Sequence, residues 1–235
     1  MRRDALFDPE RGERALAGLR RRGLNFDPRG ADPHAPGSGW RVDDYRQQLP
    51  PEGPGAPSER GSWQTACWLL GAYEFVDPSI VRALYRADLP LRGRDMLLEL
   101  RIWGLRFHVG VRVVEISEGT VTDSGRLAAV WGWNYRTLEG HFEAGQMDYE
   151  VRKWLDTGEV EFRIHAYSRT AHIANPVLRV GFSLLGRRKQ TQFARHACKR
   201  MRRLTERELE RWDAAAGHGR HAVGHGLVVR PSVAL

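Results

Sequence analysis

Apolar and polar residues alternate through most of the middle of the chain. A period of two places the apolar side chains of a strand on one face of a β-sheet. The alternation occupies five runs, at residues 98–102, 105–113, 127–135, 147–151 and 160–166. Short segments rich in Gly, Asp and Ser separate several of these runs, which predicts hairpins and an antiparallel sheet. An earlier run, WRVDDYRQQL at 40–49, predicts a further strand at the start of the domain.

Apolar residues at helical spacing, together with helix start signals, predict four helices. The first is a short basic helix over residues 8–22. Ser62 is suited to an N-cap, which predicts a second helix over residues 63–76. Asp77-Pro78 offers a cap and a first-turn proline, which predicts another short helix over residues 79–85. The longest helix is predicted from Asn175-Pro176 to about Trp212, with an apolar stripe opposite a basic face.

The predicted order is a strand, two short helices, five or six antiparallel strands and one long helix. A sheet with one apolar face must cover that face, and a long amphipathic helix laid across a curved sheet does so. This order predicts an α+β helix-grip fold. The predicted organisation is an N-terminal extension and linker (residues 1–39), the helix-grip domain (40–213) and a flexible C-terminal tail (214–235).

Length and composition narrow the class of protein. The 235 residues are enough for one sizeable core. The longest apolar run is far shorter than the roughly 18–20 residues of a membrane span, and the charged N-terminus lacks a secretory signal. Cys67 and Cys198 form neither a metal-binding spacing nor a disulfide framework. These features predict a cytoplasmic protein.

The net charge of +8 has its origin largely in one segment. Residues 187–211 contain ten Lys or Arg and three Glu. The basic face of the last helix is expected to include Arg195, Lys199, Arg202 and Arg203. A solvated face is the simplest interpretation, and an anionic lipid surface is an alternative. The helix lacks the interleaved aromatic residues of single-strand binders, which argues against nucleic acid.

Several short motifs in the second half resemble a known family. They are Tyr135-Arg136-Thr137-Leu138-Glu139-Gly140-His141, Gly145, Ala166-Tyr167-Ser168-Arg169 and Asn175-Pro176. The pattern resembles uncharacterised protein family 0548, a bacterial and plant family of unknown function, over about residues 40–205. This sequence has Arg136, Glu139 and Thr170 where the family has Gly, Pro and Pro. The resemblance implies a START-like fold, in agreement with the order of elements.

The inward face of the predicted sheet is rich in large side chains. These side chains either line an apolar ligand cavity or fill the space themselves. The candidate cavity residues are Phe107, Trp131, Trp133, Tyr135, Tyr149, Phe162 and Ile164. Tyr135 is the most polar member and the natural hydrogen-bonding anchor.

Four polar residues near the strand ends are further candidates. Thr137 and Arg169 are candidate polar anchors for a ligand, although Arg169 is also suited to pair with an acidic neighbour such as Glu143 or Glu150. His141 and Glu143 are the acid–base candidates. A structural interpretation competes with this one, in which Thr137 or His141 bonds backbone groups at the end of a strand, and no catalytic residue is assigned.

The sequence contains no phosphate-binding loop, nucleophile elbow or zinc ligand set. His218, His221 and His225 lie in a Gly-rich segment without acidic or Cys partners, so neither a metal nor a cofactor is expected. The function predicted is binding of a small hydrophobic or amphipathic molecule, such as a lipid, between sheet and helix. The alternatives are a cyclase- or hydratase-type enzyme that uses the same cavity, and an interaction protein that binds anionic membrane or nucleic acid. Oligomeric state is not predicted.

Overall fold

The computed structural model describes residues 9–27, 33, 35, 37–102, 105–171, 176–214 and 227–230. Its helices are α1 (Pro9–Arg20), α2 (Ser62–Gly71) and α3 (Pro176–Ala214). Its strands are β1 (Arg41–Leu49), β2 (Val81–Arg86), β3 (Asp95–Ile102), β4 (Leu105–Asp123), β5 (Arg126–Thr137), β6 (Glu143–Trp154), β7 (Val160–Thr170) and β8 (Leu227–Arg230). None of the described helices has the length and hydrophobicity needed to cross a membrane.

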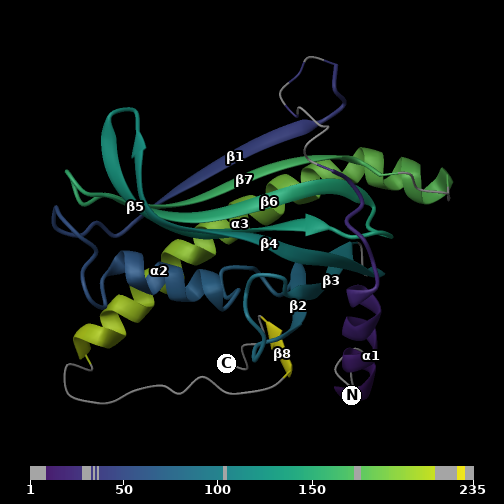
Figure 1. The fold of residues 1–235 in the computed structure, drawn as a ribbon, viewed down its shortest axis with the longest axis horizontal. Coiled ribbons are helices and arrows are strands. Elements are labelled where there is room, and N and C mark those ends of the chain that lie inside the picture. Colours follow the sequence, from purple (N-terminus) through teal and green to yellow (C-terminus); the bar gives the residue numbers. More distant parts are fainter. Residues whose placement is uncertain are drawn as a thin grey trace.

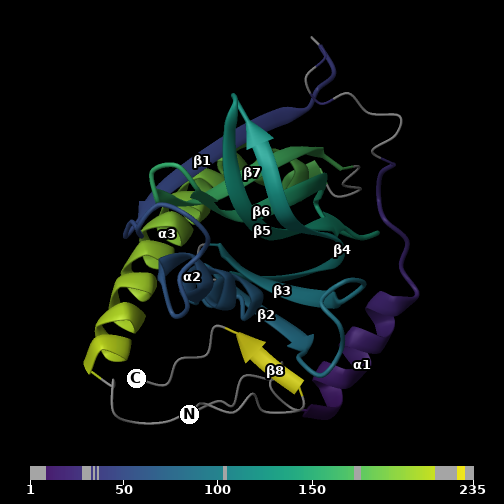
Figure 2. The same cartoon turned by 60° about the vertical axis from the view of Figure 1, so that its left-hand side comes forward.

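The strands form one antiparallel sheet in the order β1-β7-β6-β5-β4-β3-β2-β8. Strands β3 to β7 follow one another as hairpins, as the alternating pattern predicts. β1 is an edge strand of the sheet and pairs with β7, where Tyr45 lies opposite Ile164. The sheet curves, and α3 runs diagonally across one of its faces with α2 beside it (Figures 1 and 2). This arrangement confirms the helix-grip prediction.

The main core lies between the inner face of the sheet, α2 and α3. Phe193, Ala197 and Met201 of α3 are buried there, on the stripe that the helical spacing predicts. Trp133 and Tyr149 on neighbouring strands place their ring centroids 5.1 Å apart. Burial of each such aromatic side chain removes roughly 150–250 Å² from water, so these residues supply much of the core's apolar area.

α1 belongs to the predicted N-terminal extension, yet it packs on the domain. Leu16 and Leu19 of α1 are buried in a second cluster with Leu84, Leu97 and Leu138. Neighbours of these strand residues, such as Ala83 and Leu98, point to the main core, so α1 covers the face of the sheet opposite α3 (Figure 2).

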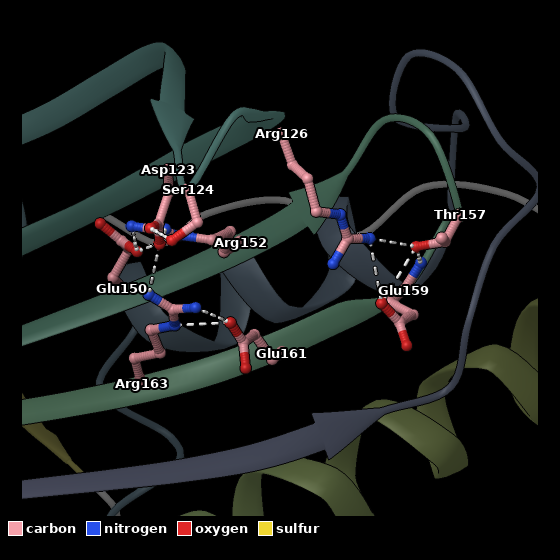
Figure 3. Close-up of polar contacts among 9 residues, drawn as sticks. All are labelled: Asp123, Ser124, Arg126, Glu150, Arg152, Thr157, Glu159, Glu161 and Arg163. Atoms are coloured by element: carbon pink, nitrogen blue, oxygen red, sulfur yellow. Dashed lines mark hydrogen bonds and ion pairs between the residues drawn. The ribbon is translucent and has the colours of Figure 1, made fainter.

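A third apolar cluster lies under the β4–β5 hairpin, where Trp154 packs with Ala128 and Val130 and is only 8% exposed. The guanidinium groups of three arginines approach the Trp154 ring, at 4.4, 5.4 and 5.7 Å from its centroid. These are Arg126, Arg152 and Arg163. Figure 3 shows carboxylates that pair with all three: Asp123 lies between Arg152 and Arg163, and Glu159 pairs with Arg126. The arginines are therefore fixed as a cover over the indole.

A buried ion pair ties the loop before α2 to β6. Lys153 is 0% exposed and donates to the Glu52 carboxylate at 2.8 Å and to the Ala56 carbonyl at 2.8 Å. Glu52 also accepts from the amides of Ser58 and Trp63. Burial raises the pKa of Glu52, but the hydrogen bonds from Lys153 and the two amides outweigh it, so the net pKa is lowered. Glu52 thus caps the start of α2.

Three local predictions differ from the structure. The helix predicted over 79–85 is wrong, because Val81–Arg86 form β2. Ser62 is not the N-cap of α2, since Gly61 occupies that position without a side-chain cap and Glu52 bonds the helix's second amide instead. Within the segment predicted to be a flexible tail, Leu227–Arg230 pair with β2 as β8. Of the two short helices predicted after the first strand, only the first is present, as α2.

Candidate functional site

A cavity of about 150 Å³ lies between the inner face of the sheet and α3. The strand residues Leu98, Leu100 and Ile164 and the α3 residues Phe193 and Ala194 form apolar walls. More polar residues also line it, and several of these, including Asp43, Gln146 and Ser168, are partly exposed. The cavity therefore runs from a polar rim to an apolar interior.

The structure divides the seven predicted cavity residues into three groups. Tyr135 and Ile164 line the cavity. Trp133, Tyr149 and Phe162 are buried in the main core, where Tyr149 and Phe162 stack at 6.4 Å between ring centroids. These three fill space rather than enclose it.

The other two predicted cavity residues lie elsewhere. Trp131 is partly buried and packs against the end of α2, where its Cη2 would approach a Cβ at Gly71 to 3.3 Å. Phe107 contacts the ring of Phe142, with centroids 5.6 Å apart, and Phe142 itself lines the cavity. Phe107 therefore supports a wall residue.

Three tyrosine hydroxyls and one thioether lie together beside the cavity, which Tyr73, Tyr135 and Met147 line. Tyr149 donates to the Met147 sulfur at 2.8 Å, and its hydroxyl lies 3.4 Å from that of Tyr135. Burial raises the pKa of Tyr135 to about 12 and raises those of Tyr73 and Tyr149 well above the usual value. All three phenols are therefore protonated hydrogen-bond donors at neutral pH.

Tyr73 is placed in the cavity wall by an unusual helix ending. Its amide donates to the Leu70 carbonyl at 3.2 Å, and the Glu74 amide donates to the Leu69 carbonyl at 3.0 Å. This is the Schellman arrangement, in which the residue after the C-cap takes a left-handed conformation and is usually glycine. Tyr73 takes it with a φ of 60°. A side chain in this region costs about 1–2 kcal/mol, and sequence patterns give no sign of the exception.

Thr137 lies at the end of β5 and bonds backbone groups, as the structural interpretation of the sequence proposes. Its hydroxyl accepts from the Gly145 amide at 2.9 Å and lies 2.6 Å from Oδ1 of Asn25. Thr137 is 5% exposed. Its hydroxyl therefore joins β5 to β6 and to the segment after α1.

His141 lines the cavity and is held by its own turn. Its Nδ1 accepts a hydrogen bond from the Glu143 amide at 3.0 Å, which leaves the ring proton on Nε2. Burial lowers the pKa of His141 to about 4, despite the opposing effect of that hydrogen bond. At neutral pH His141 therefore contributes an uncharged donor. Glu143 also lines the cavity.

The basic candidates do not line the cavity. Arg169 is exposed, with its guanidinium 4.8 Å above the Trp40 ring, so it packs on an aromatic face instead of the predicted Glu143 or Glu150. The four basic-face residues of α3 are all exposed, and Arg202 pairs with Glu206 one turn later at 2.7 Å. These four are Arg195, Lys199, Arg202 and Arg203.

Within the described residues, no three His, Cys, Asp or Glu side chains are grouped so as to hold a metal ion. His218, His221 and His225 lie outside the described residues.

A curved antiparallel sheet, a long helix across one face and a cavity between them define a helix-grip protein. A family model described as a domain of unknown function, DUF1990, matches residues 26–200. The chain belongs to this family. The match confirms the resemblance to an uncharacterised START-like family that the motifs of the second half indicate. α1 precedes the matched range.

The sequence matches no curated protein. Among solved structures it is similar to the Zhui aromatase/cyclase from Streptomyces sp. R1128, with 17% identity, a TM-score of 0.43 and coverage of 77% of this chain and 99% of that one. A START superfamily protein from Mycobacterium smegmatis is 11% identical, with a TM-score of 0.43 and coverage of 71% and 97%. A hypothetical protein from Helicobacter pylori is 11% identical, with a TM-score of 0.45 and coverage of 78% and 96%.

Proposed function

We propose that this protein binds a small hydrophobic or amphipathic molecule in the cavity between the sheet and α3. The observation that carries the proposal is a preformed cavity with apolar walls and a few convergent polar groups, which is the usual composition of a ligand site. The polar groups are the phenols of Tyr73 and Tyr135 and the neutral imidazole of His141.

Burial of apolar ligand surface supplies the driving force, at about 25 cal/mol per Å² removed from water. A cavity of about 150 Å³ is the size that holds roughly one benzene-sized ring. A larger ligand would bury one ring-sized group and extend past the polar rim, where Gln146 and Ser168 are partly exposed. The proposal therefore covers both small aromatic compounds and the end of a longer amphipathic molecule.

An enzyme using the same cavity is the second candidate, because His141 and Tyr135 both line it. General acid–base catalysis works best when the catalytic pKa is near the working pH. Burial moves the pKa of His141 down to about 4 and that of Tyr135 up to about 12, away from neutrality in both cases. This favours binding over proton transfer.

An anionic partner on the basic face of α3 is the third candidate. Binding to anionic membrane or nucleic acid through Arg195, Lys199 and Arg203 would weaken steeply as salt is raised. Binding of an uncharged molecule in the cavity would not. A titration repeated at low and high salt separates the two classes.

The direct test is native mass spectrometry of the purified full-length protein, followed by denaturation and analysis of released compounds. A co-purifying lipid or aromatic compound supports the proposal. The Ala166→Leu variant, which adds bulk to the cavity wall, is expected to lose that compound, whereas Ala17→Leu on the exposed side of α1 is expected to keep it. Equal retention by both variants would place the ligand elsewhere.

A further inference from the structure

The Tyr73 hydroxyl is a buried hydrogen-bond donor beside the cavity. Tyr73 is 1% exposed, and its side chain lines the cavity. Its hydroxyl lies beside those of Tyr135 and Tyr149, but within the described part of the chain no group satisfies the distance and angle of a hydrogen bond to it. Tyr85, which is also buried, instead donates to the Ala72 carbonyl at 3.0 Å. Buried polar groups in folded proteins are normally hydrogen-bonded, so the exception at Tyr73 calls for a partner.

The backbone at Tyr73 points to the same conclusion independently. Its left-handed conformation, with a φ of 60°, is one that glycine would adopt without strain at the end of α2. A glycine there would end the helix equally well but would supply no side chain to the cavity. The fold thus holds an unfavourable residue at this position, and its side chain lines the cavity with a buried hydroxyl that makes no well-formed hydrogen bond. Residues with strained backbone conformations are enriched at ligand-binding and active sites.

The charges around the cavity disfavour an anionic ligand. Two carboxylates, Asp43 and Glu143, line it. Arg101 also lines it, but this guanidinium contacts the buried carboxylate of Glu99 at 3.0 Å. His141 is uncharged at neutral pH. An anion entering the cavity would therefore lose its hydration beside two negative groups.

We propose that the cavity selects an uncharged ligand that buries one ring-sized apolar group and accepts a hydrogen bond from Tyr73 through a ketone, ester or ether oxygen. This rests on the proposed function and names the chemical class of its ligand. The ring-sized limit follows from the volume of the cavity, and the acceptor follows from the unpartnered hydroxyl. Tyr73 acts here as a binding and orienting residue.

Three probes of similar size separate the parts of this proposal. Acetophenone carries a neutral acceptor, ethylbenzene has none and benzoate is charged. Isothermal titration of the full-length protein is expected to show acetophenone binding more tightly than ethylbenzene, and benzoate not binding. In Tyr73→Phe, acetophenone is expected to weaken about fivefold while ethylbenzene does not weaken, because one neutral hydrogen bond has been lost. Tyr85→Phe is the matched control and is expected to leave the affinity for all three probes unchanged.

The possible failures are distinguishable. If ethylbenzene and acetophenone bind the wild-type protein equally well, the cavity binds ligands but the assignment of an acceptor to Tyr73 is wrong. Benzoate binding as tightly as acetophenone would overturn the exclusion of anions. If no probe binds and native mass spectrometry shows no ligand, the proposed function fails as well. The comparison of probes on the wild-type protein needs no variant, so a folding defect in Tyr73→Phe would not remove the test.

Discussion

Leu19 of α1 occupies the space where a side chain at Gly110 of β4 would lie. A Cβ atom at Gly110 would come within 2.6 Å of Leu19 Cδ2 and 3.2 Å of Leu138 Cδ1. Leu19 is 2% exposed, so it has little room to move aside. The domain surface is therefore shaped to receive α1, although α1 lies before the part of the chain that the family model matches.

Gly110→Ala is expected to lower the free energy of unfolding by about 1–3 kcal/mol, because the added methyl overpacks the contact with Leu19. In a Leu19→Ala background the same substitution is expected to have a much smaller effect, which a double-mutant cycle from urea unfolding would measure. Gly18→Ala is the control: nothing lies near a Cβ there, and alanine favours the helix by about 0.5–1 kcal/mol. Additive effects at Leu19 and Gly110 would contradict the contact.

The ion pair between Glu52 and Lys153 is expected to respond unequally to loss of either partner. Glu52→Gln leaves a fully buried ammonium without its counter-ion, at a cost of about 3–5 kcal/mol. Lys153→Met is expected to be less damaging, since Glu52 keeps its bonds from two backbone amides. Chemical unfolding measures both, with Glu59→Gln at an exposed position as a control near zero. A larger loss in Lys153→Met would contradict the argument.

Stability is expected to fall as pH is lowered from about 6.5 towards 4, because of His141. The folded pKa of His141 is about 4, whereas an exposed histidine titrates near 6.5. Between these values the unfolded chain binds the extra proton, so protonation favours unfolding. Carboxylates with lowered pKa, such as Glu52 and Asp77, lose their contribution only at lower pH. His141→Asn retains an acceptor for the Glu143 amide. In this variant the decrease in the free energy of unfolding between pH 7.5 and 4.8 is expected to be smaller by on the order of 1 kcal/mol.

Two tryptophans offer a matched test of the arginine cover over Trp154, whose ion pairs are drawn in Figure 3. Trp154 is 8% exposed beneath its arginines, so Trp154→Ala is expected to cost about 3–5 kcal/mol of unfolding free energy. Trp68 on α2 is 56% exposed, and Trp68→Ala is expected to change stability by less than about 0.5 kcal/mol. Thermal and urea unfolding of the two variants would show this contrast. Similar losses in both would mean that the arginines do not seal Trp154 from water.

Strands that bury one face could be predicted from the sequence, whereas a strand buried on both faces could not. β4 to β7 alternate in sequence because one side packs in the apolar main core, whereas the other side carries polar residues such as Arg136 and Asp148. In β2, Ala83 and Tyr85 face the main core while Leu84 packs under α1. Its apolar residues are therefore continuous, and a continuous short run does not distinguish a strand from a helix.

The site was predicted less completely than the fold, for a geometric reason. Alternation identifies which residues point inward, as it did for Tyr135 and Ile164. It does not show which inward residues meet one another and which leave a gap, as the contacts between Trp133 and Tyr149 illustrate. The position of the Tyr73 side chain depends on a left-handed turn at the end of α2. The sequence does not indicate this turn, because glycine is the residue that normally marks it.

The pairing of β1 with β7 has a kinetic consequence. Residue 45 meets residue 164, and all of β2 to β6 lies between them in the chain. The hairpins from β3 to β7 need only short loops to close, whereas β1 can dock only once its distant partner is in place. Contacts of β1 are thus expected to form after the rate-limiting step. Weakening them should shorten the lifetime of the folded state while leaving the rate of its formation nearly unchanged.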